Sequence, residues 1–169
     1  MDLSQVYREH YRSLVRFLYR RIGDLARAED LAQEAFVRAL EHQPDKPRAW
    51  LFTVAANLAR DEGRRAAVRR RHLTLIKAEA QALPPEPGPE VALVRREEVR
   101  RVQAALSRLA GRDREALLLW EEGFSYDEIA EVLGLSRGSM GTTLARARTR
   151  LVAAYEELES KESDEDVAH

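Results

Sequence analysis

Residues 124–151, FSYDEIAEVLGLSRGSMGTTLARARTRL, constrain the fold more than any other stretch, because their pattern predicts two closely joined helices. Ser125 followed three residues later by Glu128 is the capping-box pattern that begins a helix at the next residue. Gly134 ends that helix where a left-handed backbone is needed, and Ser136 is placed to cap a second helix. Two helices joined so closely must cross steeply, so the segment predicts a helix-turn-helix.

The second helix of this motif separates an apolar face from a face of small, polar and basic groups. The apolar face, expected to lie in the core, carries Met140, Leu144, Ala147 and Leu151. The opposite face carries Thr142, Ala145, Arg146 and Thr149. Such a face is suited to close approach to a DNA duplex. An ordinary helical hairpin with a solvated arginine face is the alternative.

The composition favours helices throughout the 169 residues. Ala, Leu, Arg and Glu dominate, and β-branched residues rarely alternate with polar ones, so the chain is predicted to be all-α. It contains no cysteine, which excludes disulfides and thiolate metal sites and is compatible with a reducing compartment. No apolar run approaches the roughly 20 residues of a membrane span. We therefore expect a cytoplasmic protein without membrane insertion.

Changes of composition divide the chain into four parts. Helical periodicity fills residues 1–72, a linker covers 73–92, and periodicity returns over 93–155. The linker holds four of the six prolines and is predicted to be flexible. Residues 156–169 carry seven acids against one lysine and are predicted to be a disordered tail. The expected fold is therefore two small helical domains joined by a flexible proline-rich linker, the second containing the helix-turn-helix.

Helical spacing also predicts which apolar side chains form the two cores. In the first domain, the helix AEDLAQEAFVRALE places Leu31, Ala35, Phe36, Ala39 and Leu40 on one face. In the second domain, the residues expected to be buried include Val99, Val102, Leu106, Leu109 and the run Ala116 to Trp120.

Basic charge concentrates in the first domain, although the net charge of the chain is only −1. Residues 1–72 contain 15 Lys+Arg against 10 Asp+Glu. The segment RRAAVRRRH ends the third predicted helix, where like-charge repulsion would weaken an isolated helix. Phosphates would neutralise this cluster, with salt-dependent release of counterions. A solvated helix end is the alternative, because cations also suit the negative end of the helix dipole.

Catalysis is not indicated by any constellation of residues. Glu29, Asp30 and Glu34 lie on one helix, but no glutamate has the histidine three residues later that metal sites of helical bundles use. The four histidines are scattered and show no ligand spacing. There is no phosphate-binding glycine loop and no placed nucleophile. The sequence therefore predicts a protein that is not an enzyme and that needs no cofactor or metal.

Three segments in one order resemble the extracytoplasmic-function (ECF) sigma factors, the smallest class of the sigma-70-like initiation factors of bacterial RNA polymerase. AEDLAQEAF is similar to the family's DLxQExF segment, and PRAWLFTVAANLARDEGRR is similar to its WLxxIAxNLxxDxxRR segment. The run from LSRLAGRDRE to the end of the helix-turn-helix resembles its carboxy-terminal domain. The resemblance covers residues 3 to 155 and implies a two-domain promoter recogniser.

The resemblance also implies three partners: bacterial core RNA polymerase, promoter DNA and an anti-sigma factor. The residues matching the family's polymerase-clamp contacts are Asp30, Gln33, Glu34 and Phe36, with a core role as the alternative for Phe36. Those matching its minus-ten contacts are Asn57, Arg60, Arg64, Arg65 and Arg69. Those matching its minus-thirty-five contacts are Arg137, Ser139, Thr142, Ala145 and Arg146. Phosphate contacts would position the protein, and a few base-edge contacts would specify the sequence.

Two other functions are compatible with the residues alone. A stand-alone helix-turn-helix repressor or activator would use its amino-terminal helices for dimerisation or ligand sensing. A helical adaptor would bind a protein partner and carry its arginines as surface charge. The repressor would bind duplex DNA without polymerase, whereas the adaptor would show no salt-dependent binding to nucleic acid.

Overall fold

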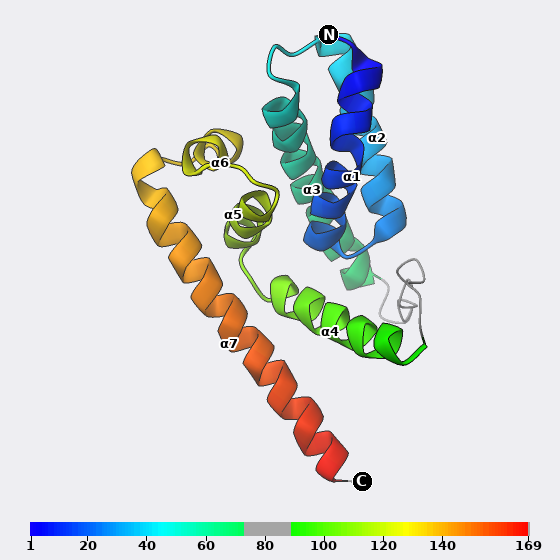
Figure 1. Cartoon of the computed structure of the whole chain (residues 1–169), viewed down its shortest axis with the longest axis vertical. Coiled ribbons are helices and arrows are strands. Elements are labelled where there is room, and N and C mark those ends of the chain that lie inside the picture. The colour runs from blue at the N-terminus through cyan, green and yellow to red at the C-terminus, as the bar shows by residue number, and fades with distance from the viewer. Residues whose placement is uncertain (73–88, 169) are drawn as a thin grey trace.

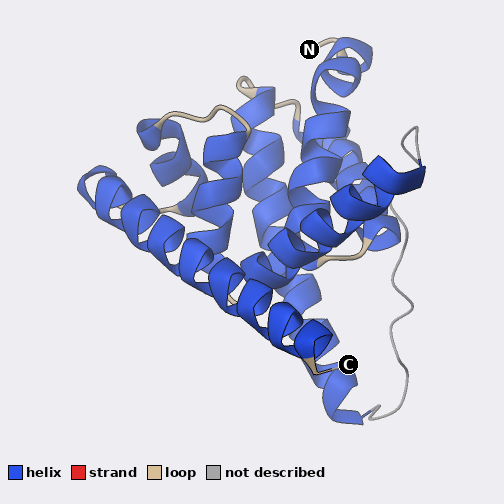
Figure 2. Cartoon of the chain, turned by 60° about the horizontal axis from the view of Figure 1, so that its bottom comes forward, coloured by secondary structure: helices blue, strands red, loops and turns tan. Residues whose placement is uncertain are grey.

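The computed structural model describes residues 1–72 and 89–168, and every regular element within these ranges is a helix (Figure 1 and Figure 2). Side chains are described for residues 1–66 and 95–168. Most of the predicted linker, 73–92, lies outside the described residues, but helix α4 already begins at Pro89. None of the described helices is long and apolar enough to cross a membrane.

The first unit is a bundle of three helices, α1 (Leu3–Ile22), α2 (Leu25–His42) and α3 (Pro47–His72). Aspartates begin the first two helices, since the carboxylate of Asp2 accepts hydrogen bonds from backbone N–H groups of α1 and that of Asp24 does so for α2. Gly23 ends α1 with a left-handed backbone, φ 78°, which costs glycine little. Helix α2 ends at His42, and α3 begins at Pro47, a first helical position that suits proline.

The second unit consists of α4 (Pro89–Ser107), α5 (Gly111–Glu121), α6 (Tyr126–Leu133), the 3₁₀ turn η1 (Arg137–Ser139) and α7 (Met140–Val167). The predicted capping box is confirmed: the Ser125 hydroxyl accepts from the backbone N–H of Glu128, and the Glu128 carboxylate accepts from that of Ser125. This backbone donor, followed by the Ser125 hydroxyl, holds the pKa of Glu128 below its ordinary value. Gly134 ends α6 in the left-handed region, as predicted.

The prediction that Ser136 caps the second helix of the motif is wrong. No side-chain hydrogen bond caps η1 or α7, and the chain enters α7 through the 3₁₀ turn. The carbonyl of Ser136 instead accepts from both the backbone N–H and the hydroxyl of Ser139. This tight turn brings Met140 into the core as the first residue of α7.

The acidic segment after residue 155 is helical, which differs from the predicted disordered tail. Residues 156–167 continue α7 as one long helix, and α7 packs against α4 (Figure 1). Arginines of α4 and of the turn after it supply the opposite charges: Arg101 pairs with Glu162, and Arg108 pairs with Glu157 at 3.3 Å. Lys161 adds a pair with Glu157 one turn away. These cations pair with two of the seven acids, Glu157 and Glu162, and so reduce the repulsion between like charges along the helix.

Several residues predicted to be buried are exposed. Leu40 on α2 is half exposed, as are Val99 and Val102 on α4 and Trp120 on α5. The other predicted faces are confirmed, including Leu31, Ala35, Phe36 and Ala39 in the first unit and Leu106, Leu109 and residues 116–119 in the second. Spacing identifies an apolar face but cannot tell how far a neighbouring helix covers it.

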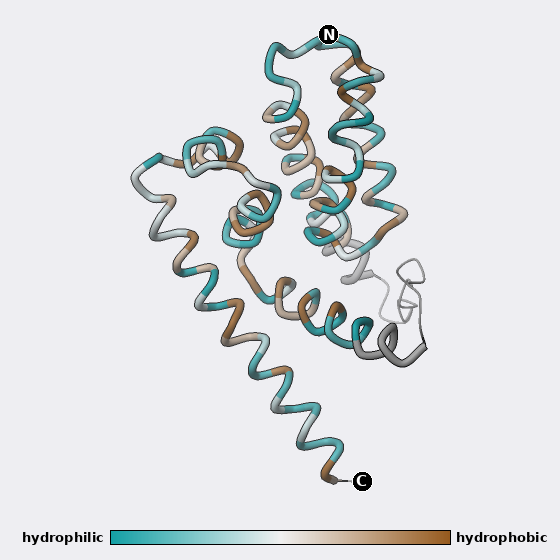
Figure 3. Tube along the Cα trace, viewed as in Figure 1, coloured by the Kyte–Doolittle hydropathy of each residue, from teal (hydrophilic) through white to brown (hydrophobic). Residues whose placement is uncertain are grey.

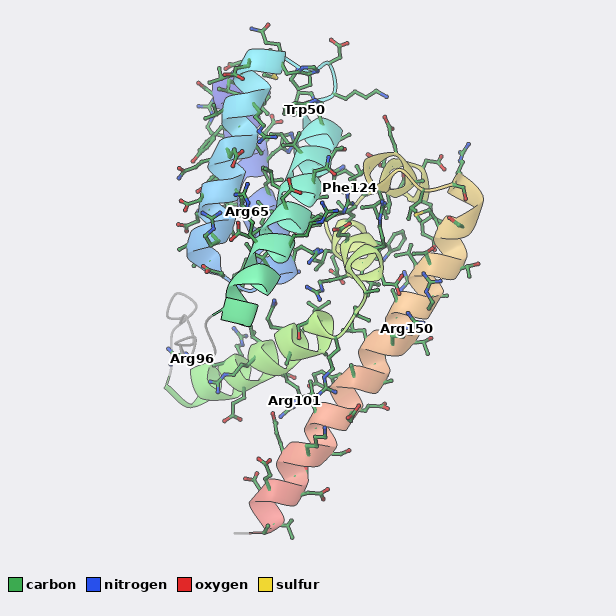
Figure 4. All side chains as sticks on the ribbon, turned by 180° about the vertical axis from the view of Figure 1, so that it is seen from behind. Trp50, Arg65, Arg96, Arg101, Phe124 and Arg150 are labelled. Carbon is green, nitrogen blue, oxygen red and sulfur yellow. The ribbon has the colours of Figure 1, made fainter. Side chains whose placement is uncertain are left out.

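The two units pack against each other, so that one buried apolar cluster runs through both. Helices α5 and α6 lie against α1 and α3, and Figure 3 shows apolar residues on α3, α5 and α6 where they meet. Phe124, just before α6, meets Phe52 of α3 edge to face with ring centroids 4.9 Å apart (Figure 4). The structure therefore joins the helix-turn-helix directly to the helix that carries the predicted minus-ten residues.

Replacing Ser125 by alanine is expected to destabilise the protein by about 1 kcal/mol, because the amino-terminal end of α6 loses its cap. Ser136→Ala is the matched control, since this serine precedes the next helical turn but its side chain makes no capping bond. Urea denaturation followed by circular dichroism measures both free energies of unfolding. Equal losses in the two variants would contradict the assigned cap.

Candidate nucleic-acid and protein interfaces

An acidic stripe runs along the exposed side of α2. Asp30, Gln33 and Glu34 are exposed on it, and positions 37 and 41 continue the same helical face. The carboxylate of Asp30 lies 3.3 Å from Arg27, and Glu34 pairs with Arg38 one turn later. These pairs are solvent-exposed and weak, so the carboxylates can exchange their arginines for the cations of a partner.

Val37 lies in the middle of this stripe and is 55 % exposed. The sequence analysis missed it, although its position between Glu34 and Glu41 on one helical face was a usable signal. An exposed apolar side chain surrounded by acids can bury itself against a partner while the rim supplies charge. The stripe therefore combines apolar and electrostatic contact.

Phe36, predicted as a clamp contact, belongs to the core. It is 5 % exposed, and its ring lies 5.0 Å from that of Tyr7 and 6.2 Å from that of Tyr11. The core alternative of the sequence analysis therefore describes its side chain. Phe36 packs α2 onto α1 and so positions the stripe on the opposite side of the helix.

The predicted minus-ten residues lie along α3 and differ in exposure and in their hydrogen-bond partners. Arg64 and Arg65 are exposed, with Arg64 3.7 Å from the carboxylate of Asp61. Arg60 is instead engaged within the protein: its guanidinium donates to Asn57 at 2.8 Å and to Glu115 of α5 at 2.8 Å and 3.3 Å. Arg69 lies on the last turns of α3, but its side chain lies outside the described residues.

An aromatic pair stands at the start of α3, beside the loop that connects it to α2. The indole ring of Trp50 stacks on the imidazole ring of His42 with centroids 5.3 Å apart and planes tilted by 14°. Trp50 is only half-buried. A partly exposed ring next to a basic helix offers a stacking surface for a nucleic-acid base.

The predicted reading face of α7 is exposed as its periodicity indicated. Thr142, Ala145 and Thr149 are all exposed on one side, while Met140, Leu144 and Ala147 are buried on the other. Ser139 is half-exposed in the turn before the helix. Arg137 pairs with Asp127 of α6, and both side chains are exposed. The helix therefore presents small side chains that allow close approach to a groove.

Arg146 lies on this exposed face, but its guanidinium group is held by α5. Its guanidinium donates to the carboxylate of Asp113 on α5 at 2.7 Å and 3.3 Å, and this hydrogen bonding raises the pKa of Arg146. Arg150, one turn later, reaches the same carboxylate at 3.2 Å (Figure 4). Asp113 is buried, so it fixes the direction in which Arg146 can reach.

The sequence analysis also missed the two buried carboxylates of α5, Asp113 and Glu115. Both are buried within a helix whose other buried residues are apolar. The available signal was the placement of two acids in the first turns of a helix that then continues as an apolar run. Buried acids require charged partners, so each of them predicts an arginine that approaches from another helix.

Arg114, between these acids, ties the two units together through carbonyl groups. Its guanidinium donates to the backbone oxygens of Arg21, Ser107 and Leu109. Burial, together with the nearby Arg21, lowers the pKa of Arg114 to about 10, which leaves it charged at neutral pH. Within residues 1–66 and 95–168, no group of three or more His, Asp or Glu side chains could hold a metal ion.

Comparison with known proteins identifies the class of protein that combines these surfaces. Residues 6–77 match Sigma-70 region 2, and residues 99–151 match Sigma-70, region 4. The chain therefore belongs to the sigma-70 family of RNA polymerase sigma factors, and its relatives place it in the ECF class. Its first unit contains region 2, and its second unit contains region 4.

Two curated relatives match nearly the whole chain. It is 33% identical over 156 residues to the RNA polymerase sigma factor YlaC of Bacillus subtilis, covering 89% of this chain and 90% of that one. It is also 33% identical over 172 residues to the ECF RNA polymerase sigma factor SigL of Mycobacterium tuberculosis, covering 92% and 90%.

Two solved structures share the arrangement of both units. The sigma factor RpoE of Bartonella quintana, in complex with the anti-sigma factor NepR, superimposes with a TM-score of 0.73 at 25% identity, covering 92% of this chain and 97% of that one. CnrH, in complex with the cytosolic domain of CnrY, gives a TM-score of 0.67 at 28% identity, covering 92% and 88%.

Replacing Asp113 by asparagine is expected to destabilise the protein by about 1 to 3 kcal/mol, because two arginines lose charge-assisted hydrogen bonds to a buried acceptor. Asp127→Asn removes the charge of an exposed pair with Arg137 and should cost under about 1 kcal/mol. Urea denaturation compares the two. A larger loss of unfolding free energy in Asp127→Asn than in Asp113→Asn would contradict the role assigned to the burial of Asp113.

Proposed function

We propose that this chain initiates transcription as an ECF sigma factor by dividing three tasks among three helices. Helix α2 binds core RNA polymerase, α3 contacts the minus-ten promoter element, and α7 reads the minus-thirty-five element. The chain catalyses nothing itself, and it acts in the cytoplasm, where polymerase and DNA are found. The observation that carries the proposal is the presence of an exposed acidic stripe on α2 and an exposed reading face on α7 in one region 2–region 4 chain.

The polymerase contact is proposed on charge and apolar grounds together. Gln33 and Glu34 precede Val37 by one turn of α2 and Glu41 follows it by one turn, so a basic partner surface with an apolar centre would complement the stripe, which Asp30 extends. Charges of opposite sign would steer the encounter, and burial of Val37 would slow dissociation. Phe36 is buried on the other side of α2 and supports the stripe by packing this helix against α1.

At the minus-ten element, Arg64 and Arg65 are the exposed cations that would hold the DNA backbone. Asn57 and Trp50 lie nearer the start of α3 and offer an amide and a ring to an unstacked base. Unstacking a base costs a few kcal/mol, and contacts of this kind offset the cost. Arg60 would join this set once it leaves Glu115, and we include Arg69 because the family resemblance implies a minus-ten contact for it.

At the minus-thirty-five element, Thr142 and Ala145 would contact base edges or thymine methyl groups in the major groove. Arg146 would supply the basic contact of the reading face through Nη1, because its Nε and Nη2 atoms donate to Asp113. Arg137 and Ser139 lie in the turn before α7 and would contact the phosphate backbone. Because few long side chains lie on this face, shape and close approach contribute much of the recognition.

A groove between the two units is suited to an anti-sigma factor. It has a volume of about 770 Å³ and is lined by half-exposed Val99, Val102 and Trp120 with Arg16 and Arg148 at its edges. Apolar side chains with a charged rim are typical of a protein-binding surface. Both structural relatives are complexes, one with the anti-sigma factor NepR and one with the cytosolic domain of CnrY.

The proposal is tested by mixing the purified chain with core polymerase. We expect co-elution in gel filtration and promoter-dependent transcripts from DNA selected by the reconstituted holoenzyme. A stand-alone repressor or activator would bind duplex DNA without polymerase and fail both assays. Failure of co-elution by the folded chain would overturn the proposal.

Val37→Asp is expected to weaken polymerase binding by about tenfold, since one apolar contact at the centre of an interface contributes more than 1 kcal/mol. Val152→Asp is the matched control, because this valine is also 55% exposed on a helix but lies on α7, away from the stripe. Fluorescence anisotropy of the labelled chain titrated with core polymerase measures both affinities. Equal weakening of polymerase binding in the two variants would contradict a role for α2 in the interface.

Replacing Arg64 and Arg65 together by glutamine should reduce promoter opening on all promoters. It should also lower the slope of log K for promoter binding against log salt by about 1 per arginine. Permanganate reactivity of unpaired thymines and transcript yield measure the effect. The control pair is Arg8 and Arg12, exposed on α1. Thr142→Ala should instead change the preference among upstream sequences, and identical effects of the two changes would contradict the division of tasks.

A further inference from the structure

Besides the shared apolar cluster, the contact between the two units includes several arginines of region 2 that donate to acceptors of region 4. At one edge, Arg16 of α1 forms two hydrogen bonds of 2.7 Å with the carboxylate of Glu122. Arg48 donates to the carbonyl of Glu122 at 2.6 Å, and its guanidinium lies 3.8 Å from the ring centroid of Phe124. A cation over an aromatic face adds electrostatic attraction to the packing.

The centre of the contact is the carboxylate of Glu115, which is completely buried. It accepts from Arg21 of α1 at 3.2 Å and from two guanidinium nitrogens of Arg60 on α3. Both arginines belong to region 2, whereas Glu115 belongs to region 4. The buried charge is therefore neutralised across the junction by the other unit.

We propose that Glu115 is a latch that keeps the free chain closed and withholds Arg60 from DNA until a partner separates α5 from α3. The proposal rests on the proposed function, because it takes Arg60 as a minus-ten contact. It adds that the chain regulates this contact by itself, through a carboxylate of its own promoter-reading unit.

The donors of Arg60 show why the latch and DNA exclude each other. The Nε and Nη2 atoms, which form the edge that binds a phosphate through two bonds, both donate to Glu115. Nη1 donates to Asn57, so a second predicted minus-ten residue is engaged as well. A phosphate can reach this edge only when Glu115 leaves it.

The balance of burial and charge allows the latch to open. Burying Glu115 against Arg21 and Arg60 gains electrostatic attraction but removes the carboxylate and much of both arginine side chains from water, and the two contributions nearly cancel. On separation, water hydrates the charges again, so opening leaves no buried charge unpaired. A partner that binds both units over a larger surface can therefore shift the chain to the open state.

The neighbouring carboxylate, Asp113, behaves differently on opening. Its partners Arg146 and Arg150 lie on α7 of the same unit, so these pairs persist when the units separate. Opening therefore changes the cations available at the minus-ten surface and leaves the minus-thirty-five face as it is. A substitution of Glu115 should therefore change DNA binding by the minus-ten surface of the free chain and leave DNA binding by its minus-thirty-five face unchanged.

The test measures closure first and DNA binding second. Because the chain has no cysteine, dyes can be placed at Arg8→Cys and Glu131→Cys, both exposed and in different units. Energy transfer between them should fall in Glu115→Gln and in Arg21→Gln. It should stay unchanged in the control Glu162→Gln, whose pair with Arg101 lies within one unit. Circular dichroism establishes that each variant is folded.

DNA binding is then measured by anisotropy of a labelled single-stranded oligonucleotide with the chain alone. We expect Glu115→Gln to bind about fivefold more tightly, and its log K to fall more steeply with log salt by about 0.7, the value for one released cation. The double variant Glu115→Gln/Arg60→Gln should lose this gain.

Unchanged energy transfer in both latch variants, or a gain in DNA affinity that persists without Arg60, would overturn the proposal. Failure of the proposed function is read separately, from promoter opening by holoenzyme carrying Arg60→Gln. If that variant opens promoters normally while Glu115→Gln separates the units, the latch exists but Arg60 is not a minus-ten contact, and the masking part of the proposal falls.

Discussion

The two buried carboxylates of α5 are the charges on which the rest of the arrangement depends. Asp113 and Glu115 are two residues apart, so an α-helix directs them about 200° apart, toward opposite neighbours. Asp113 holds the arginines of α7, and Glu115 holds those of α1 and α3. A single helix of 11 residues therefore pairs with α7 on one side and with the first unit on the other.

Local features of the fold could be predicted from the sequence because their causes are local. The Ser125–Glu128 capping box, the left-handed Gly134 and the buried face of α7 each depend on residues within a few positions of one another. The exposed reading face follows from the same periodicity. Asp30, Gln33 and Glu34 were likewise placed correctly on the exposed side of α2, since helical spacing alone decides that.

Features that depend on contacts between distant segments could not be predicted in this way. Glu115 meets Arg21 and Arg60 across 94 and 55 positions of sequence, and no periodicity encodes such a meeting. Val99, Val102 and Trp120 have core-like spacing, yet the neighbouring helices leave them half-exposed along a groove. The helical acidic end of α7 depends in the same way on cations supplied by α4 and the turn after it.

The length of α7 connects these distant features. It is one continuous helix of 28 residues, whose first turns carry Thr142 and whose last turns pair with α4 through Arg101 and Glu162. Between these ends, Arg146 pairs with the buried carboxylate of Asp113 on α5. The exposed face around Thr142 and the acidic extension therefore belong to one helix, whose position is fixed by ion pairs with both α4 and α5.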